Sequence, residues 1–296
     1  VKSHKREIGR IEISVVDNNT DEKNDENKKE KKVVLPNNNV SFIKDFFFQY
    51  NRIDPNKNFD NFIIGSSNKI AFEASKKVSE KTSHYNPLYI YGGVGMGKTH
   101  LLNSIGLSLK DTQKVMFISA ERFMYQFVKS IKSNDMVKFK EYFRNADVFL
   151  IDDIQFMNGK ETLQEEFFHT FNALLEKGSQ IIISGDRPPN KLYKIQERIK
   201  SRFSGGLVID IQQPDFELRY KIVKVKSEEL KKYYSDQINI SEEIQKFISS
   251  EIKNSIRELV GALNRVVSFS RIYNKTPNLS ETKIVLKDLL NLPENK

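Results

Sequence analysis

The sequence predicts an α/β protein built on a five-stranded parallel sheet, followed by a small all-α domain. Five short apolar runs alternate with helix-like stretches, and they lie at 88–91, 115–118, 148–151, 181–183 and 207–211. Short apolar strands that alternate with helices are typical of parallel sheets, whose two faces are both buried. The strand-like runs stop before residue 214, and amphipathic helices are predicted over 216–233, 241–272 and 280–290.

The chain divides into four segments by composition. Residues 1–16 include an alternating apolar run with no strand nearby to complete a sheet, which indicates the remnant of an N-terminal domain. Residues 17–41 are rich in Asp, Glu, Asn and Lys, so a disordered charged linker is expected, with a solvated charged helix as the alternative. The α/β domain is expected over 42–213 and the helical domain over 214–296.

The composition favours an anionic partner and excludes cysteine chemistry. The chain has 48 Lys and Arg residues against 39 Asp and Glu residues, and its net charge of +9 suits nucleic acid or nucleotide. It has no cysteine, which removes disulfides, thiolate metal sites and cysteine nucleophiles and agrees with a cytoplasmic location. No run approaches the roughly 20 apolar residues that span a bilayer, so membrane insertion is not expected.

The stretch from 88 to 100 predicts a phosphate-binding loop. It consists of an apolar run, the spacing Gly92-x4-Gly97-Lys98-Thr99 and the apolar start of a helix, which fits strand, loop and helix. Glycines let backbone N–H groups turn toward phosphate oxygens, and the helix N-terminus adds partial positive charge. We expect Lys98 to reach the β- and γ-phosphates and Thr99 to hold magnesium, with a plain glycine-rich turn as the alternative.

Two acids follow the apolar run 148–151. Their carboxylates would lie at the edge of the sheet where parallel strands end and ligands bind. Asp152 is expected to hold the hydration shell of magnesium, and Asp153 to orient an attacking water. Because the Asp153 side chain is one methylene shorter than a glutamate, we expect slow hydrolysis. The alternative is a turn in which the two acids only end the strand.

Polar and basic residues mark three further positions. Ser184 and Asp186 follow the fourth apolar run and are candidates for sensing a γ-phosphate or positioning the attacking water, unless they only form a turn. Arg198 and Arg202 are four residues apart and share a helix face, from which an arginine can complete a neighbouring subunit's nucleotide site. Arg257 lies beside an apolar helix stripe. For the basic residues, a solvated helix surface is the alternative.

Several stretches together resemble the AAA+ ATPases, and among them the DnaA family of bacterial chromosomal replication initiators. The resemblance covers about 59–290, and its closest stretches are 86–102, 151–156, 164–175, 198–203 and 257–264. The stretch 164–175 is the most specific, because general ATPase chemistry does not require its sequence Gln-Glu-Glu-Phe-Phe-His-Thr-Phe-Asn-Ala-Leu-Leu. The phosphate loop alone would identify only a nucleoside triphosphatase.

The resemblance implies ATP or ADP and Mg²⁺ as ligands, and a weak ATPase that acts as a switch. It implies an arginine finger at Arg198 that contacts ATP in the adjoining protomer, a lid arginine at Arg257 and a sensor at Asp186. It also places adenine against the segment 61–65. The implied nucleotide contacts are Asn61, Ile64, Gly65, Gly92, Gly93, Val94, Gly95, Met96, Gly97, Lys98, Thr99, His100 and Arg257.

The insertion 119–146 is similar to the helices that wedge successive protomers of the family into a filament. Phe123, Phe127 and Ile131 are spaced along one of its predicted helices, and Arg144 resembles a contact between protomers. Assembly of several copies of the chain in the ATP state is therefore expected from the resemblance.

The implied partners are single-stranded origin DNA, a replicative helicase reached through an N-terminal domain, and acidic phospholipid. DNA contacts are implied at Val128, Lys160, Thr162 and Arg202. Thr162 stands where the family commonly has an arginine, which changes the expected strength or geometry of DNA binding. The sequence ends at Lys296, where the family continues into a helix-turn-helix domain that reads duplex boxes. Alternative functions are a helicase loader, a clamp-binding regulator, or an adaptor that holds nucleotide only as a structural ligand.

Overall fold

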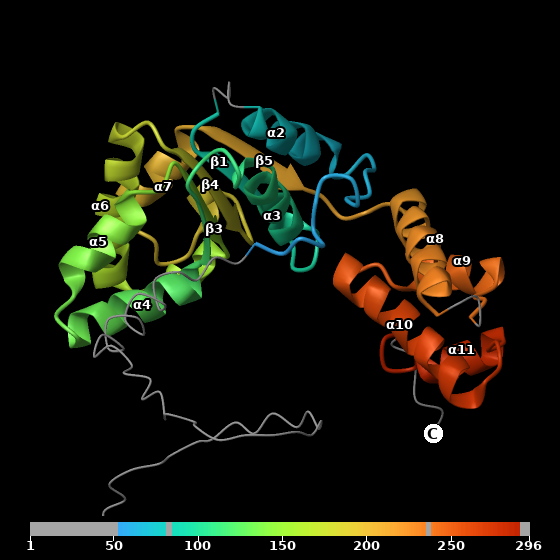
Figure 1. Ribbon diagram of the computed structural model, residues 1–296. Coiled ribbons are helices and arrows are strands. Elements are labelled where there is room, and N and C mark those ends of the chain that lie inside the picture. Colours follow the sequence, from blue (N-terminus) through green and yellow to red (C-terminus); the bar gives the residue numbers. More distant parts are fainter. Residues whose placement is uncertain (1–52, 81–84, 235–237, 291–296) are drawn as a thin grey trace, which may run out of the picture. The chain divides into compact units, whose positions relative to one another are not determined.

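The computed structural model describes residues 53–80, 85–234 and 238–290, which form an α/β domain followed by a helical lid (Figure 1). The expected N-terminal remnant over 1–16 and the expected linker over 17–41 lie outside the described residues. In the described ranges, no helix has the length and apolar character needed to cross a membrane.

A five-stranded parallel sheet forms the centre of the α/β domain, as the alternation of apolar runs predicts. Its strands run in the order β2-β3-β4-β1-β5, and every neighbouring pair is parallel. The bounds are β1 Leu88–Gly92, β2 Val115–Ser119, β3 Val148–Asp152, β4 Gln180–Gly185 and β5 Leu207–Ile211. Strands β1, β3 and β4 are adjacent, so their carboxyl ends bring together the phosphate loop and the two polar strand ends that follow it.

Helices cover both faces of the sheet, and each face has its own apolar core (Figure 1). One core receives side chains from α2 and α3, and the other from α4 to α7. The short helix η1 follows β3, and η2 precedes α7. The bounds are α2 Lys69–Ser79, α3 Lys98–Leu109, α4 Ala120–Lys132, α5 Met136–Arg144, η1 Ile154–Met157, α6 Glu161–Glu176, η2 Pro189–Lys191 and α7 Glu197–Ser204.

The insertion after β2 forms α4 and α5, and most of its aromatic side chains belong to the core. Phe123 and Phe127 are buried against Phe139, with ring centroids 5.3 Å and 5.8 Å from it. Ile131, which the sequence groups with them, is 52% exposed. Of the three residues expected to serve assembly, only Ile131 therefore offers its side chain to a partner.

Within residues 214–234 and 238–290, the described part of the lid, four helices surround a third apolar core, α8 Phe216–Tyr233, α9 Glu242–Glu251, α10 Ile256–Tyr273 and α11 Leu279–Val285. The prediction of one helix over 241–272 is wrong, because α9 ends at Glu251 and a new helix follows. Ser255 caps this new helix by accepting a hydrogen bond from the Glu258 amide. The helix expected over 280–290 is also shorter, since α11 ends at Val285 and turns follow it.

Candidate functional site

The loop between β1 and α3 has the shape of a phosphate cradle. Gly95 and Gly97 adopt φ angles of 75° and 99°, which residues with a Cβ rarely adopt. Because Gly97 stands immediately before the first residue of α3, the loop passes directly into a helix N-terminus. Amide groups at such a terminus, together with the helix dipole, favour an anion.

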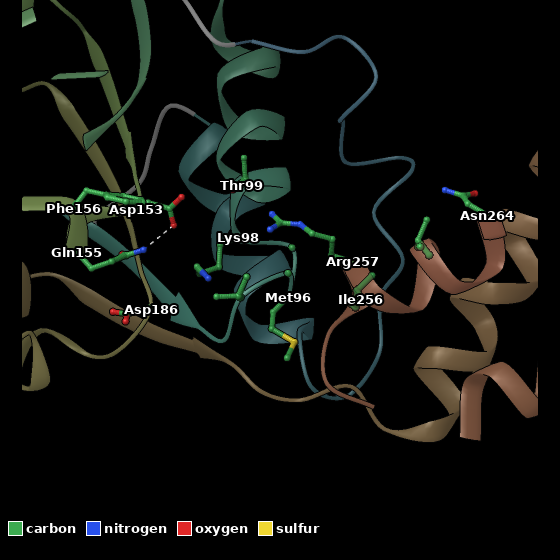
Figure 2. A pocket seen from close by; sticks show the side chains of 15 residues that line it. Met96, Lys98, Thr99, Asp153, Gln155, Phe156, Asp186, Ile256, Arg257 and Asn264 are labelled. Atoms are coloured by element: carbon green, nitrogen blue, oxygen red, sulfur yellow. Dashed lines mark hydrogen bonds between the residues drawn. The ribbon is translucent and has the colours of Figure 1, made fainter. Parts of the chain in front are cut away.

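Lys98 is the first residue of α3, and its side chain folds back along this loop. Its Nζ donates hydrogen bonds of 2.8 Å to the carbonyl oxygens of both Gly92 and Gly93, and only 7% of the residue is exposed. Burial lowers the pKa of the ammonium, while the nearby charge of Asp153 opposes that shift. In Figure 2 the Lys98 side chain points to the side of the pocket where Asp153 and Asp186 lie.

Thr99 and Asp152 form the oxygen-rich corner of the site. The Thr99 hydroxyl donates to Asp152 Oδ2 at 2.8 Å, and the Asp152 side chain is completely buried. Carboxylate and hydroxyl oxygens suit Mg²⁺, which commonly takes one or two protein ligands and completes its shell with phosphate and water. These two residues therefore fit as its protein ligands. Among the described residues, no cluster of three His, Cys, Asp or Glu side chains offers a different metal site.

Ser184 lies behind this corner. Its buried hydroxyl donates to Asp152 Oδ1 at 2.5 Å and accepts the Asp153 amide N–H at 2.8 Å. Ser184 therefore orients the end of β3. Of the two residues that the sequence marks as candidates for a γ-phosphate contact, Asp186 lines the cavity and Ser184 does not. The Asp186 carboxylate also accepts hydrogen bonds from the Arg187 guanidinium.

Asp153 faces the cavity in an unusual backbone conformation. Its φ of 58° lies in the left-handed region, and its Oδ1 accepts a hydrogen bond from Gln155 Nε2 at 3.0 Å (Figure 2). Left-handed conformations of residues other than glycine cost energy and cluster at functional sites. The hydrogen bond from its amide to the Ser184 hydroxyl holds the backbone at this residue, whose carboxylate lines the cavity.

The loop and the lid share a cavity of about 620 Å³, and Lys98, Thr99, Asp153 and Asp186 are part of its lining (Figure 2). Arg257 enters it from α10, and a Cβ placed on Gly95 would lie 3.0 Å from the Arg257 Cβ. Several residues of its lining were not predicted from the sequence as site residues, namely Gln155, Phe156, Ile256, Val260, Gly261 and Asn264. Helical spacing from Arg257 would have found the last three, because they follow it by three, four and seven residues.

A second cavity, of about 250 Å³, lies beside the first. Asn61, Phe62 and Ile63 line it together with Gly97, His100 and lid residues that include Ile222 and Lys226. Of the segment expected to flank adenine, Ile64 and Gly65 are not part of this lining. A Cβ on Gly65 would lie 2.9 Å from Leu218, so that residue serves the contact with α8.

Arg198 lies outside both cavities, on the exposed surface where α7 meets α6. Its Nε donates to Gln196 Oε1 at 2.7 Å, its guanidinium lies 4.7 Å from the centre of the Phe168 ring, and Glu165 is 3.6 Å away. The side chain is 45% exposed. Arg144, by contrast, makes a 3.0 Å ion pair with the largely buried Glu166 of its own chain.

The four candidate DNA contacts are spread over three helices and one loop. Val128 is 43% exposed on α4, while Thr162 and Arg202 are exposed on α6 and α7. Lys160 precedes α6, and its Nζ donates to the Phe156 carbonyl at 2.8 Å. Helix α4 packs against η1, which leads into Lys160, so these two candidates lie on neighbouring elements.

The sheet order, the loop and the helical lid define a P-loop protein of the AAA+ type. The Holliday junction branch migration motor RuvB of Thermotoga maritima has the same fold, with a TM-score of 0.58 and 17% identity over 84% of this chain and 76% of RuvB. The family model of the bacterial DnaA ATPase domain matches residues 53–210. The chain belongs to this family.

Curated and solved relatives agree with that assignment. The chain is 45% identical to the chromosomal replication initiator protein DnaA of Ehrlichia ruminantium over 244 residues, which are 80% of this chain and 51% of the relative. It therefore spans about half the length of that protein. Domain III of Thermotoga maritima DnaA matches with a TM-score of 0.75 and 38% identity, over 81% of this chain and 99% of that one. A replication initiator DnaA bound to AMPPCP and single-stranded DNA matches with a TM-score of 0.66 and 31% identity, over 81% of this chain and 82% of that one.

Proposed function

We propose that this chain is the ATP-switched core of a chromosomal replication initiator. ATP or ADP binds at Gly92–Thr99, and the ATP state assembles copies of the chain into a filament. The filament binds single-stranded origin DNA and opens the origin. Slow hydrolysis returns it to the unassembled state, so the chain works as a weak ATPase in the cytoplasm.

The position of Arg198 is the observation that carries this proposal. Lys98, Asp153 and Asp186 line the cavity that contains the phosphate loop, and Arg257 enters it from the lid. Arg198 is not part of that lining and is held on the outer surface by side chains of α6 and by Gln196. An exposed arginine that another subunit's γ-phosphate recruits would make assembly depend on the third phosphate.

Magnesium would be held by Thr99 and Asp152, where it supplies charge neutralisation for the phosphates. Asp153 is the only cavity-lining carboxylate on the strand end next to them, and it would orient the attacking water. Its side chain is short, and its Oδ1 already accepts a hydrogen bond from Gln155 Nε2. Both features favour slow hydrolysis, which suits a timer better than a motor.

Single-stranded DNA binding is supported by the relative that contains such DNA and by the chain's net charge of +9. Contacts from Lys160 and Arg202 to phosphates would make the affinity fall with rising salt. Thr162 cannot add a charge at its position. We propose a replicative helicase and acidic phospholipid as partners of the longer protein, because the family resemblance implies them.

The proposal is tested with Arg198→Ala. This change should leave the affinity for ATP near normal and abolish ATP-dependent assembly, measured by sedimentation in ATP and in ADP, with and without single-stranded DNA. Lys200→Ala removes a positive charge from the same helix, where Lys200 pairs only with Glu197 among the described residues, and should assemble normally. Equal loss of ATP affinity and assembly in Arg198→Ala would contradict the assigned role.

An adaptor that holds nucleotide only as a structural ligand is the second candidate. The contact between Thr99 and the buried carboxylate of Asp152 favours the ATPase, because a structural ligand does not require a carboxylate at the metal corner. Magnesium-dependent hydrolysis that disappears in Asp152→Asn would exclude the adaptor, whereas complete absence of hydrolysis in the unmodified chain would favour it.

A further inference from the structure

Asn103 is a buried polar residue of α3 that no part of the nucleotide chemistry requires. It is 1% exposed and lies five residues after Lys98 on the helix that begins at the phosphate loop. Its Oδ1 accepts the Asp54 amide N–H at 2.7 Å, and its Nδ2 donates to the carbonyl oxygens of Asp54 at 2.7 Å and Lys57 at 2.6 Å. Three hydrogen bonds of one side chain therefore hold a loop that is more than 40 residues away in the sequence.

His100 adds a fourth bond between the same two segments. It precedes Asn103 by three residues, so the two side chains leave the same face of α3. Its Nε2 lies 2.9 Å from the carbonyl oxygen of Asn58. A carbonyl oxygen only accepts, so Nε2 carries the proton in this contact. We name Asn103 and His100 together the α3 clamp.

The clamped loop leads directly into the wall of the second cavity. Asn58 and Asn61 exchange two hydrogen bonds, in which each backbone N–H donates to the other residue's Oδ1, at 3.1 Å and 3.0 Å. Asn61, Phe62 and Ile63 then line the cavity. The Phe62 ring also meets the His100 ring edge-on, with centroids 5.2 Å apart. Fixing the loop at its start therefore also fixes the position of the wall.

The same helix thus presents the phosphate-binding residues and holds the wall of the neighbouring cavity. The phosphates and the base belong to one molecule, so the distance between the phosphate loop and the cavity wall must match the nucleotide. A wall that α3 holds in a fixed position relative to Lys98 and Thr99 is already ordered before the nucleotide binds. Pre-ordering lowers the entropy cost of binding, and the gain applies only to the part of the ligand that touches the ordered wall.

We propose that the α3 clamp positions the base-binding wall relative to the phosphate cradle and so contributes affinity and selectivity for the base of an adenine nucleotide. Neither residue needs to touch the base for this role. The inference rests on the proposed function, in which a nucleotide binds with its phosphates at Gly92–Thr99, and it adds that the base of this nucleotide lies in the second cavity.

The test compares nucleotides with inorganic tripolyphosphate, which carries the phosphate charge without a base. Binding of ATP, ADP, GTP and magnesium tripolyphosphate is measured by calorimetry on the unmodified chain and on Asn103→Ala. We expect affinity for ATP and ADP to fall about tenfold, since buried hydrogen bonds are lost, with unchanged affinity for tripolyphosphate and a smaller preference for ATP over GTP.

Ser104→Ala is the matched control. Ser104 is also buried on α3, but its hydroxyl donates to the His100 carbonyl within the helix and not to the loop. This variant should bind all four ligands normally. Hydrogen exchange of residues 53–64 should rise in Asn103→Ala and stay unchanged in Ser104→Ala, which locates the effect in the clamped loop.

Two results would overturn the proposal. Equal weakening of ATP and tripolyphosphate would mean that the variant damages the phosphate cradle, and unchanged affinity for ATP would mean that the clamp does not matter for binding. If circular dichroism shows that Asn103→Ala does not fold, Asn103→Asp replaces it, because the acid keeps the acceptor for Asp54 and removes both donors. Failure of the unmodified chain to bind either ATP or tripolyphosphate would instead contradict the proposed function.

Discussion

At the scale of single residues, the buried end of β3 depends on one hydroxyl group. Ser184 donates to the carboxylate of Asp152 and accepts from the amide of Asp153, so it joins both acids from the neighbouring strand. The register of the sheet causes this arrangement, because Ile151 lies opposite Ile183 and the next residues of both strands therefore meet.

Ser184→Ala should destabilise the protein and slow hydrolysis while nucleotide affinity stays nearly normal. The variant leaves a buried carboxylate oxygen with one partner fewer, which costs about 1–3 kcal/mol of unfolding free energy. Supporting groups of this kind typically change activity about tenfold or more when they are lost. Urea unfolding and steady-state hydrolysis measure the two effects. Ser75→Ala, at a buried serine of α2 that lines neither cavity, serves as control, and equal slowing there would refute a specific role.

Sequence and structure agree best where chemistry dictates spacing. The proximity of Thr99 and Asp152 follows from a loop after one strand and an acid at the end of another, because parallel strands end at the same edge. The sequence marked Ser184 only as a candidate for sensing a γ-phosphate or positioning water, and it did not mark Asn103. Their roles depend on partners that the three-dimensional fold alone selects, and a buried asparagine in a helix has no sequence signal that identifies its partner.

At the scale of elements, apolar periodicity predicted the five strands but not the ends of the lid helices. Ile248, Ile252 and Ile256 recur at every fourth residue across the break, so apolar spacing alone gives no sign that α9 ends at Glu251. The break becomes visible only in the cap geometry, where Ser255 takes an extended backbone and bonds to the Glu258 amide. Serine favours caps over helix interiors because its hydroxyl competes for backbone groups.

Asp215 is the capping residue on which the start of the lid depends. Its Oδ1 accepts the Leu218 amide at the start of α8, and its Oδ2 accepts the Ser66 hydroxyl from the α/β domain at 2.6 Å. The hydrogen bond from Ser66, and next that from the Leu218 amide, lower the pKa of the Asp215 carboxyl below its usual 3.8. The ionised form is thus the one that the fold favours.

Asp215→Ala should lower the unfolding free energy by about 1 kcal/mol at neutral pH, as the loss of a helix cap typically does. A depressed folded-state pKa contributes stability above the usual pKa of 3.8 and loses it as the pH falls through the folded value. The difference between variant and unmodified chain should therefore shrink below that range, as measured by urea unfolding. A difference independent of pH would contradict this account, and Asp111→Ala, at an exposed turn after α3, is the control.

At the scale of the whole molecule, the two halves of the proposed switch lie on separate surfaces of one chain. In the proposed switch the cavity with Lys98 and Arg257 would receive the nucleotide, whereas Arg198 is held on α7 by side chains outside that cavity. A chain with this arrangement would offer the cavity to its own nucleotide and Arg198 to a neighbour's. Such contacts are heterologous and can repeat without closing, which is the geometry of a filament.

Mixing two inactive variants tests this division directly. Arg198→Ala keeps the nucleotide cavity and lacks the finger, while Lys98→Ala keeps the finger and should not bind ATP. Neither should assemble alone. If Arg198 acts between chains, an equimolar mixture with ATP should form pairs, because each pair contains one bound nucleotide and one finger that meets it. Growth should stop at two chains, since the remaining surfaces of the pair are the defective ones. Sedimentation distinguishes the outcomes: a mixture that stays monomeric would mean that Arg198 does not serve a neighbour's site, and long assemblies would mean that contact between chains does not require the finger.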